Sequence, residues 1–176
     1  CAGSGGKSLA LAALGARVTA WDSSARRLAE LPRRAHRAGA VVEVSREEPS
    51  GEFDGVLVDA PCSGSGALAR EPDARWRIDD GAIDRFHELQ LGVLRGAAAR
   101  VRPGGALVYA TCSLFREEGE DVVHPFLAGN PEFRLSIEER RWPHRDEGAG
   151  FYLARMTRRK SGSGRRSRLT GNRGAR

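Results

Sequence analysis

The stretch GVLVDAPCS, residues 55–63, indicates the fold class most directly. Its first part, Gly55 to Val58, is a continuous apolar run, which is typical of a strand buried on both faces of a parallel sheet. The run leads to Asp59 and, three residues later, to Cys62, two residue types that carry chemistry. Because ligands of open α/β sheets bind outside the carboxyl ends of the strands, we expect a functional site here.

Strands and helices alternate on both sides of this stretch. We expect strands at 17–22, 41–44, 55–58, 106–110, 133–137 and 151–156, and helices at 9–14, 25–38, 82–102 and 117–127. The apolar stripe of the longest helix runs through Ile83, Phe86, Leu89, Val93, Leu94, Ala97 and Val101. The acidic residues at the start of the last helix, Glu117, Glu118, Glu120 and Asp121, are interpreted as solvated. The alternation predicts an α/β fold with a doubly wound, mostly parallel sheet.

The composition is that of a soluble globular domain, with 40% hydrophobic and 30% charged residues in 176. The longest stretch without charge, residues 103–115, is too short for the ~20 apolar residues of a membrane helix. The cysteines Cys1, Cys62 and Cys112 stand far apart without a C-x-x-C pair, and the four histidines are scattered. This spacing argues against a metal site or a disulfide framework and favours reduced thiols in a cytoplasmic protein.

The positive charge is concentrated at one end. The net charge is +6, but eight basic and no acidic residues lie in 157–176, so the remainder is near neutral. We therefore expect one domain at 1–156 and a basic disordered tail at 157–176. Two interpretations of the tail stay open: a solvated terminus of an arginine-biased protein, or a segment that attracts nucleic-acid phosphates.

The chain opens on the glycine-rich loop CAGSGGKS, residues 1–8. It does not fit a phosphate-binding P-loop, because the pattern G-x-x-x-x-G-K-[ST] needs glycine where Cys1 stands. A glycine loop before a helix also holds nucleotide-like cofactors, although a plain turn fits as well. Asp22, at the end of the next expected strand, can accept hydrogen bonds from ribose hydroxyls, or can be a surface aspartate.

Two cysteines, each followed by serine, come after expected strands that end at the same edge of the sheet: Cys62-Ser63 and Cys112-Ser113. A single cysteine is most often buried and inert. Two above one crevice favour thiol chemistry, with one thiolate as nucleophile and the other thiol moving a proton. Asp59 can donate a hydrogen bond if an apolar site keeps it protonated.

Four blocks resemble the RsmB/Sun family of RNA cytosine-5 methyltransferases: CAGSGGKS (1–8), VDAPCSGSGALAREPDARWR (58–77), YATCSLFREEGEDVV (109–123) and GAGFYLARM (148–156). The resemblance implies a Rossmann-like class I methyltransferase fold, S-adenosylmethionine as cofactor, and a monomer that methylates RNA. Ribosomal RNA is the first expected substrate and transfer RNA the second. The family's first strand precedes the cofactor loop, so we expect it to be missing here and the isolated fragment to be inactive.

The resemblance also implies residue roles. Cys112 is the nucleophile that adds to C6 of the cytosine, Cys62 helps to remove the C5 proton and release the RNA, and Asp59 lies against N3. The cofactor contacts carried over are Cys1, Ala2, Gly3, Ser4, Gly5, Gly6, Lys7, Asp22 and Asp59.

Three other protein classes remain as alternatives. A DNA cytosine-5 methyltransferase shares a Pro-Cys nucleophile but lacks a Thr-Cys-Ser block at the next strand end. An NAD-dependent oxidoreductase shares the glycine loop but gives no reason for two strand-end cysteines. A non-catalytic RNA-binding fragment fits the basic tail and is separated from an enzyme by measuring methyl transfer.

Overall fold

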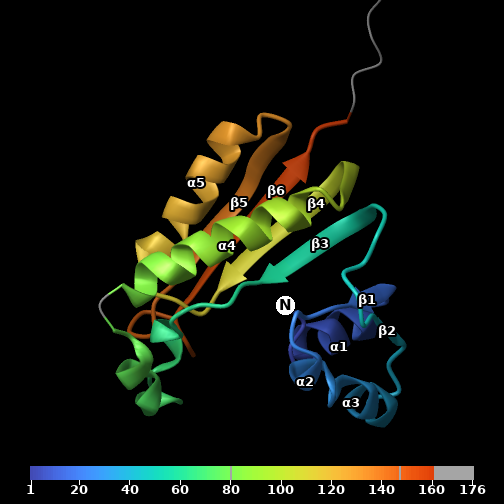
Figure 1. Ribbon diagram of the computed structural model, residues 1–176, viewed down its shortest axis with the longest axis horizontal. Coiled ribbons are helices and arrows are strands. Elements are labelled where there is room, and N and C mark those ends of the chain that lie inside the picture. The colour runs from blue at the N-terminus through green and yellow to red at the C-terminus, as the bar shows by residue number, and fades with distance from the viewer. Residues whose placement is uncertain (80, 147, 161–176) are drawn as a thin grey trace, which may run out of the picture.

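The computed structural model describes residues 1–79, 81–146 and 148–160. Helices and strands alternate along the chain, as the sequence predicts (Figure 1). The strands are β1 (Val18–Ala20), β2 (Val42–Val44), β3 (Phe53–Asp59), β4 (Val101–Thr111), β5 (Phe133–Arg141) and β6 (Phe151–Arg158). The α-helices are α1 (Gly6–Ala13), α2 (Ala25–Leu28), α3 (Leu31–Arg37), α4 (Ala82–Ala98) and α5 (Glu120–Gly129). The short 3-10 helices are η1 (Ser65–Ala67), η2 (Pro72–Arg77) and η3 (Arg116–Glu118).

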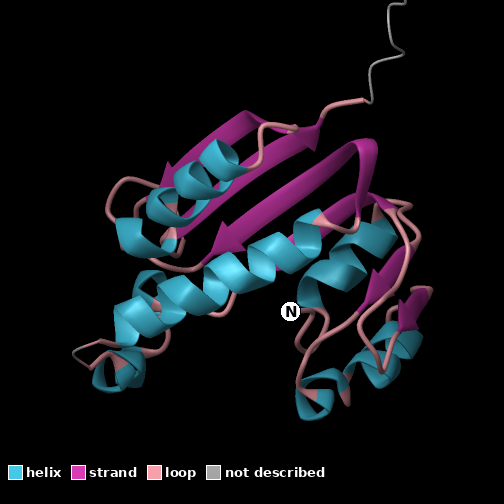
Figure 2. Cartoon of the chain, turned by 45° about the horizontal axis from the view of Figure 1, so that its top comes forward, coloured by secondary structure: helices cyan, strands magenta, loops and turns pink. Residues whose placement is uncertain are grey.

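The strands pair in both directions. A four-stranded sheet has the order β3-β4-β6-β5, in which β3 and β4 are parallel and β6 is antiparallel to both its neighbours. β1 and β2 pair in parallel as a separate sheet. Helices α4 and α5 lie on one face of the larger sheet, while α1, α2 and α3 gather around β1 and β2 (Figures 1 and 2). The α/β, Rossmann-like class predicted from the sequence is confirmed.

The larger core lies between the four-stranded sheet and helices α4 and α5. Leu94, Tyr109, Phe126 and Tyr152 are buried there, and a smaller core lies around Leu31 beside β1. The Tyr109 and Tyr152 rings meet edge to face with centroids 6.3 Å apart, a favourable aromatic geometry. This packing fixes the directions of β3 and β4, whose carboxyl ends carry the candidate site.

The helix expected at 25–38 is split in two. α2 ends at Leu28 and α3 begins at Leu31, with Pro32 in the first turn of α3. Proline has no N–H to donate to the carbonyl of Leu28, and its ring clashes with that carbonyl, so a continuous helix cannot pass this point. The first turn of a helix tolerates proline, which explains where α3 starts.

The buried face of α4 is rotated from the expected stripe. Leu94 is buried as predicted, but Leu89 is 49% exposed, and Leu91 and Ala98 are buried instead. Val101, expected in this helix, is the first residue of β4. The helix ends at Ala98 because the chain turns there into the strand.

β3 is not buried on both faces, contrary to the prediction. Of its residues only Val58 is buried. Among the described residues β3 is an edge strand that pairs only with β4, and helices α4 and α5 cover one face of this sheet (Figure 1). β4 begins before the predicted residue 106, and its register with β3 shifts between Phe53 and Gly55. Gly104, with φ +83°, supplies the left-handed conformation that such an irregularity needs.

The end of the described chain continues the sheet. β6 extends through Arg158, so Thr157 and Arg158, expected at the start of the tail, are strand residues. Residues 161–176, which make up most of the expected tail, lie outside the described residues. None of the described helices has the length and apolar character required to cross a membrane.

Candidate active site

The parallel strands β3 and β4 bring Cys62 and Cys112 together. Their ladder pairs Asp59 with Ala110, and the Ala60 N–H donates to the Ala110 carbonyl at 2.9 Å. The two loops therefore leave the sheet side by side. The Cys62 and Cys112 Sγ atoms lie 3.2 Å apart as free thiols in hydrogen-bond contact.

The pKa values of the two thiols are shifted in opposite directions. The hydrogen bond from Cys62 stabilises the Cys112 thiolate and lowers the pKa of Cys112 to about 7, although burial opposes this change. The same hydrogen bond, burial and the charge on Cys112 raise the pKa of Cys62 above its usual range. At neutral pH the proton therefore stays on Cys62, and the negative charge forms on Cys112.

Lys7 joins the glycine loop to the end of β3. Its Nζ donates to Asp59 Oδ2 at 2.6 Å and lies 5.8 Å from the centroid of the Phe151 ring. The two charged side chains are 45% and 39% exposed, so their pair contributes only about 0–1 kcal/mol to stability. The pair matters because it places the ammonium group of Lys7 beside Asp59 at the end of β3. The family resemblance placed Lys7 with the cofactor residues. Its contact with Asp59 was not predicted, because only the fold joins residues so far apart in the chain.

Asp22 anchors the glycine loop. Its carboxylate is buried and accepts hydrogen bonds from the N–H groups of Gly3 (3.0 Å to Oδ2) and Ser24 (2.9 Å to Oδ1), and from Arg27 Nε (3.0 Å to Oδ1). Burial raises the pKa of Asp22, but these hydrogen bonds and the Arg27 charge outweigh it and hold the pKa below its ordinary value. Oδ2 accepts one of these three bonds, so it has room for a second donor.

The loop has a fixed shape. Gly5 has φ +84°, and a Cβ there would lie 2.0 Å from the Cδ1 atom of Leu31. Arg34 Nη1 donates to the carbonyl and the hydroxyl of Ser4 at 2.6 and 2.7 Å. α1 begins at Gly6 without a side-chain cap, so its first backbone N–H groups remain available. The other expected cofactor residues, Cys1, Ala2 and Gly3, lie along the same loop.

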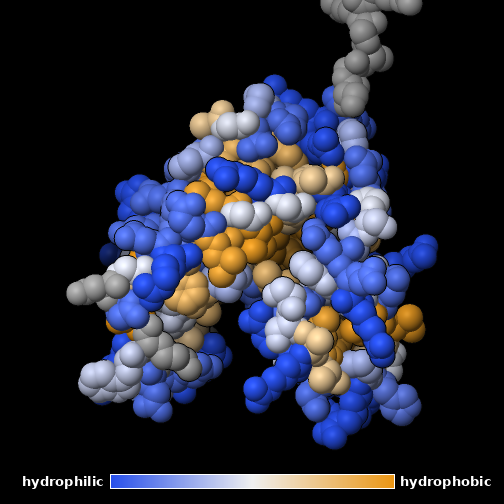
Figure 3. Space-filling view, viewed as in Figure 1, coloured by the Kyte–Doolittle hydropathy of each residue, from blue (hydrophilic) through white to orange (hydrophobic). Residues whose placement is uncertain are grey.

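The molecular surface is hollowed next to these strand ends. In the space-filling view a hollow separates the segment of η1 and η2 from the part that holds α2 and α3 (Figure 3). The arrowheads of β3 and β4 end above this hollow in the same view (Figure 1). The site is therefore approached from an open side of the molecule.

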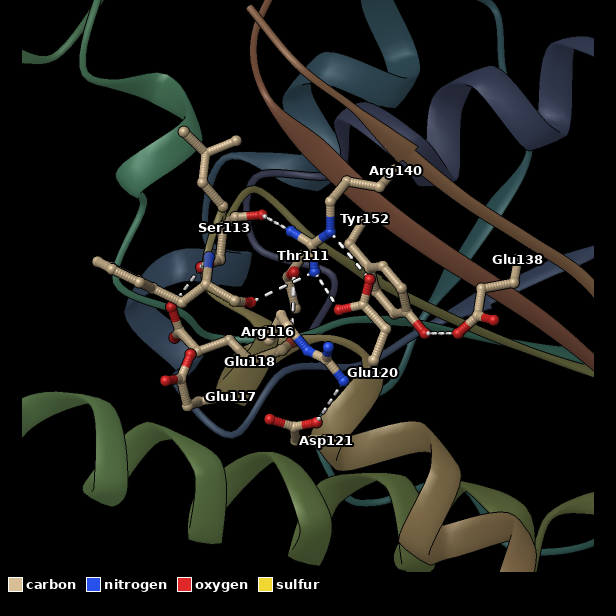
Figure 4. Close-up of polar contacts among 12 residues, drawn as sticks. Thr111, Ser113, Arg116, Glu117, Glu118, Glu120, Asp121, Glu138, Arg140 and Tyr152 are labelled. Atoms are coloured by element: carbon tan, nitrogen blue, oxygen red, sulfur yellow. Dashed lines mark hydrogen bonds and ion pairs between the residues drawn. The ribbon is translucent and has the colours of Figure 1, made fainter.

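The expected solvated acidic cluster is partly wrong. Glu118 is 0% exposed, and its carboxylate accepts hydrogen bonds from the residues that follow both cysteines, Ser63 and Ser113. Glu120 pairs with Arg140, which also donates to the Ser113 carbonyl at 3.2 Å (Figure 4). The serine that follows each cysteine is the sequence signal related to this contact, but it does not identify Glu118 as the partner.

The arrangement supplies a thiolate, a second thiol and a lysine–aspartate pair at adjacent strand ends. Such groups can add to an electrophilic carbon and move a proton. In the part of the chain that the structure describes, no three His, Cys, Asp or Glu side chains are grouped so as to hold a metal ion.

Comparisons with known proteins connect this site to relatives. Ribosomal RNA small subunit methyltransferase B of Thermus thermophilus is 39% identical over 158 residues, which are 87% of this chain and 39% of that protein. The probable enzyme of the same name in Bacillus subtilis is 38% identical over 156 residues, or 80% of this chain and 34% of that protein. The chain thus spans less than half the length of these curated relatives.

Two solved structures share the fold closely. The crystal structure of PH0851 has a TM-score of 0.83 at 33% identity and covers 88% of this chain and 40% of its own. NSun6 from Pyrococcus horikoshii, solved with SFG, has a TM-score of 0.82 at 25% identity. The match covers 92% of this chain and 47% of the NSun6 chain. The fold is that of the class I methyltransferases. The family model described as 16S rRNA methyltransferase RsmB/F matches residues 1–157, and the chain belongs to this family.

Proposed function

We propose that the protein transfers a methyl group from S-adenosylmethionine to C5 of a cytosine in RNA. The observation that carries this proposal is the 3.2 Å separation of the Cys62 and Cys112 sulfurs at adjacent strand ends. The names of the Thermus and Bacillus relatives support ribosomal RNA as the substrate, with transfer RNA as the alternative.

Cys112 makes C5 reactive in the first step. C5 of cytosine is a weak nucleophile, but addition of the Cys112 thiolate to C6 forms a sulfur–carbon bond and moves the C5–C6 electron pair onto C5. A base must leave the RNA stack to reach a thiol, and Figure 3 shows a hollow in the surface on the side of the strand ends. Asp59 pairs with Lys7 and its side chain is 39% exposed, so the apolar site expected for a protonated Asp59 is not present. We assign its carboxylate to accept a hydrogen bond from the N3–H of the adduct; N3 takes this proton from solvent and returns it when the base is released.

The glycine loop fits S-adenosylmethionine, which supplies an electrophilic methyl group on its sulfonium. A Cβ on Gly3 or Gly6 would meet no atom within 4 Å, so a ligand can approach this backbone. The uncapped N–H groups of α1 suit the carboxylate of the methionine end. Asp22 Oδ2 suits a ribose hydroxyl. The relative NSun6 was solved with SFG, an analogue of S-adenosylmethionine, which supports this assignment.

Cys62 completes the reaction. Once the Cys112 sulfur is bonded to C6, it no longer carries the negative charge that raises the pKa of Cys62. Cys62 can then lose its own proton to solvent and accept the proton from C5. The electrons of that C–H bond restore the C5–C6 double bond and expel the Cys112 thiolate.

The test uses the full-length protein and an RNA transcript that carries tritium at C5 of its cytosines. Methylation at C5 replaces that hydrogen, so tritium should enter the water in equal amount to the methyl groups transferred. Methyl transfer without tritium release would place the methyl group on another atom. RNA retention without methyl transfer would support the non-catalytic alternative.

A further inference from the structure

Glu118 connects the loops that carry the two thiols. Its Oε1 atom accepts hydrogen bonds from the Ser63 N–H at 2.8 Å and from Gln90 Nε2 at 3.0 Å. Its Oε2 atom accepts hydrogen bonds from the hydroxyls of Ser63 and Ser113, each at 2.5 Å. One buried carboxylate thus binds the residue that follows each cysteine.

The surrounding contacts hold Glu118 in place. Gln90 Nε2 also donates to the carbonyl of Pro61 at 2.8 Å, and Pro61 directly precedes Cys62. The Tyr109 hydroxyl donates to the Glu118 carbonyl at 2.9 Å, which fixes the backbone of η3 against β4. A buried carboxylate is unfavourable unless donors fill its acceptor positions, and here four donors do so. A carboxylate whose acceptor positions are filled is held in one orientation, although the buried Oε1 of Gln90 has no hydrogen-bond partner among the described residues.

We propose that Glu118 is a positioning residue for the thiol pair. By holding Ser63 and Ser113, it keeps the adjacent Cys62 and Cys112 at the separation at which their sulfurs share one proton. The catalytic purpose of this contact rests on the proposed function. The contact itself can be measured on the thiols alone.

The charged and titratable groups around the pair make the role measurable. Lys7 and Asp59 act on Cys112, whereas Tyr109 and Glu118 lie near Cys62. The negative charge of Glu118 raises the pKa of Cys62, so loss of the charge alone would ease ionisation of that thiol. If Glu118 no longer holds Ser63 and Ser113, the thiols move apart and the hydrogen bond that lowers the pKa of Cys112 is lost. The two effects act on different thiols and in opposite directions.

The experiment measures alkylation of Cys112 by iodoacetamide against pH in the full-length protein, with the modified peptide quantified by mass spectrometry. Glu118→Gln keeps the side-chain volume but has one acceptor oxygen in place of two. We expect the pH midpoint for Cys112 to rise by about one unit, which is about a tenfold loss of thiolate well below the midpoint. Glu117→Gln, the matched change at the exposed neighbour, should leave the midpoint unchanged.

A second comparison tests whether Glu118 acts through the thiol pair. Cys62→Ala should raise the Cys112 midpoint, and adding Glu118→Gln should raise it no further, because both changes remove the same hydrogen bond. An unchanged midpoint in Glu118→Gln, or shifts that simply add, would overturn the proposal. If Glu118→Gln does not fold, Ser63→Ala and Ser113→Ala replace it, since each removes one donor to Glu118. A Cys112 midpoint that is unchanged in both serine variants would overturn the proposal. If the Cys112 midpoint shifts in Glu118→Gln but the wild-type protein does not methylate RNA, the positioning role stands and only the proposed function is rejected.

Discussion

The sulfur atoms of Cys62 and Cys112 lie 3.2 Å apart although the two residues stand at the ends of different strands. Their hydrogen bond is the largest cause of the lowered pKa of Cys112. This single contact favours the thiolate form of Cys112 and keeps Cys62 protonated. The contact can be tested by substitution of either cysteine.

Cys62→Ala should make Cys112 less reactive near neutral pH. Without the hydrogen bond, the alkylation midpoint of Cys112 should rise from about 7 toward the ordinary thiol value of ~8.5. A thiolate forms above its pKa, so the wild-type protein should react fast above the midpoint and slow down as pH falls through it. Cys1, outside the pair, gives an internal reference in the same digest. Identical Cys112 profiles with and without Cys62 would contradict the pairing.

Asp22→Asn should destabilise the protein and weaken binding of S-adenosylmethionine. Hydrogen bonds to a charged group contribute roughly 1.5–3 kcal/mol each, and asparagine cannot accept all those from Gly3, Ser24 and Arg27. Because the pKa of Asp22 is lowered by folding, its contribution is present above the ordinary aspartate pKa of ~4 and is lost as pH falls through the lower folded value.

Urea unfolding and calorimetry check this prediction. The difference in unfolding free energy between wild type and Asp22→Asn should be large at neutral pH and should close in acid. Asp54→Asn, at an 86% exposed aspartate side chain of β3, is the matched control and should have little effect. A difference that stays constant from neutral to acid pH would show that the charge of Asp22 does not matter.

Gly66→Ala should disturb the loop after Cys62. A Cβ at Gly66 would lie 2.3 Å from the carbonyl oxygen of Gly150, whose N–H donates to the Gly66 carbonyl at 2.8 Å. The Gly66 N–H also donates to the Cys112 carbonyl at 2.9 Å, so strain here reaches the backbone of Cys112. We expect a loss of about 1–3 kcal/mol and slower methyl transfer.

Gly96→Ala is the control for this change, because a Cβ at Gly96 in α4 would meet no atom within 4 Å. Removing a helix glycine should raise stability by up to ~1 kcal/mol and leave methyl transfer unchanged. Thermal unfolding with an activity assay compares the two variants. Equal behaviour of both would refute the close approach of Gly66 and Gly150.

Deletion of residues 161–176 should weaken RNA binding without changing sequence preference. This segment holds five arginines and no acidic residue. If they contact phosphates, the plot of log affinity against log salt should become shallower, by about 0.7 per lost contact on single strands. Fluorescence anisotropy over a salt series measures the slope. An unchanged slope would assign the segment no part in RNA binding.

The strand ends and the thiol pair were predictable, because they follow from local pattern and from the parallel-sheet rule. Apolar runs ending at Asp59 and before Cys112 indicate strands, and parallel strands end at one edge. The single helix predicted at 25–38 was wrong, although the sequence contained the reason: Pro32 cannot lie in the middle of a helix.

The burial of Glu118 was not predictable in the same way. It belongs to a run of acids whose member Glu117 is exposed, and three of its four hydrogen bonds come from Ser63 and Gln90, which are far away in the sequence. Only the fold brings Ser63, Ser113 and Gln90 around one carboxylate. The exposure of β3 likewise depends on which strands pair beside it, a property that a single apolar run does not contain.

In the proposed mechanism Cys112 attacks the base and Cys62 releases it. This mechanism is tested most directly by denaturing electrophoresis of the full-length protein after incubation with RNA and S-adenosylmethionine. We expect a covalent protein–RNA species that accumulates with Cys62→Ala and is absent with Cys112→Ala and with the double variant. An adduct that builds up in Cys112→Ala and requires Cys62 would reverse the roles, and activity in both variants without any adduct would contradict the mechanism.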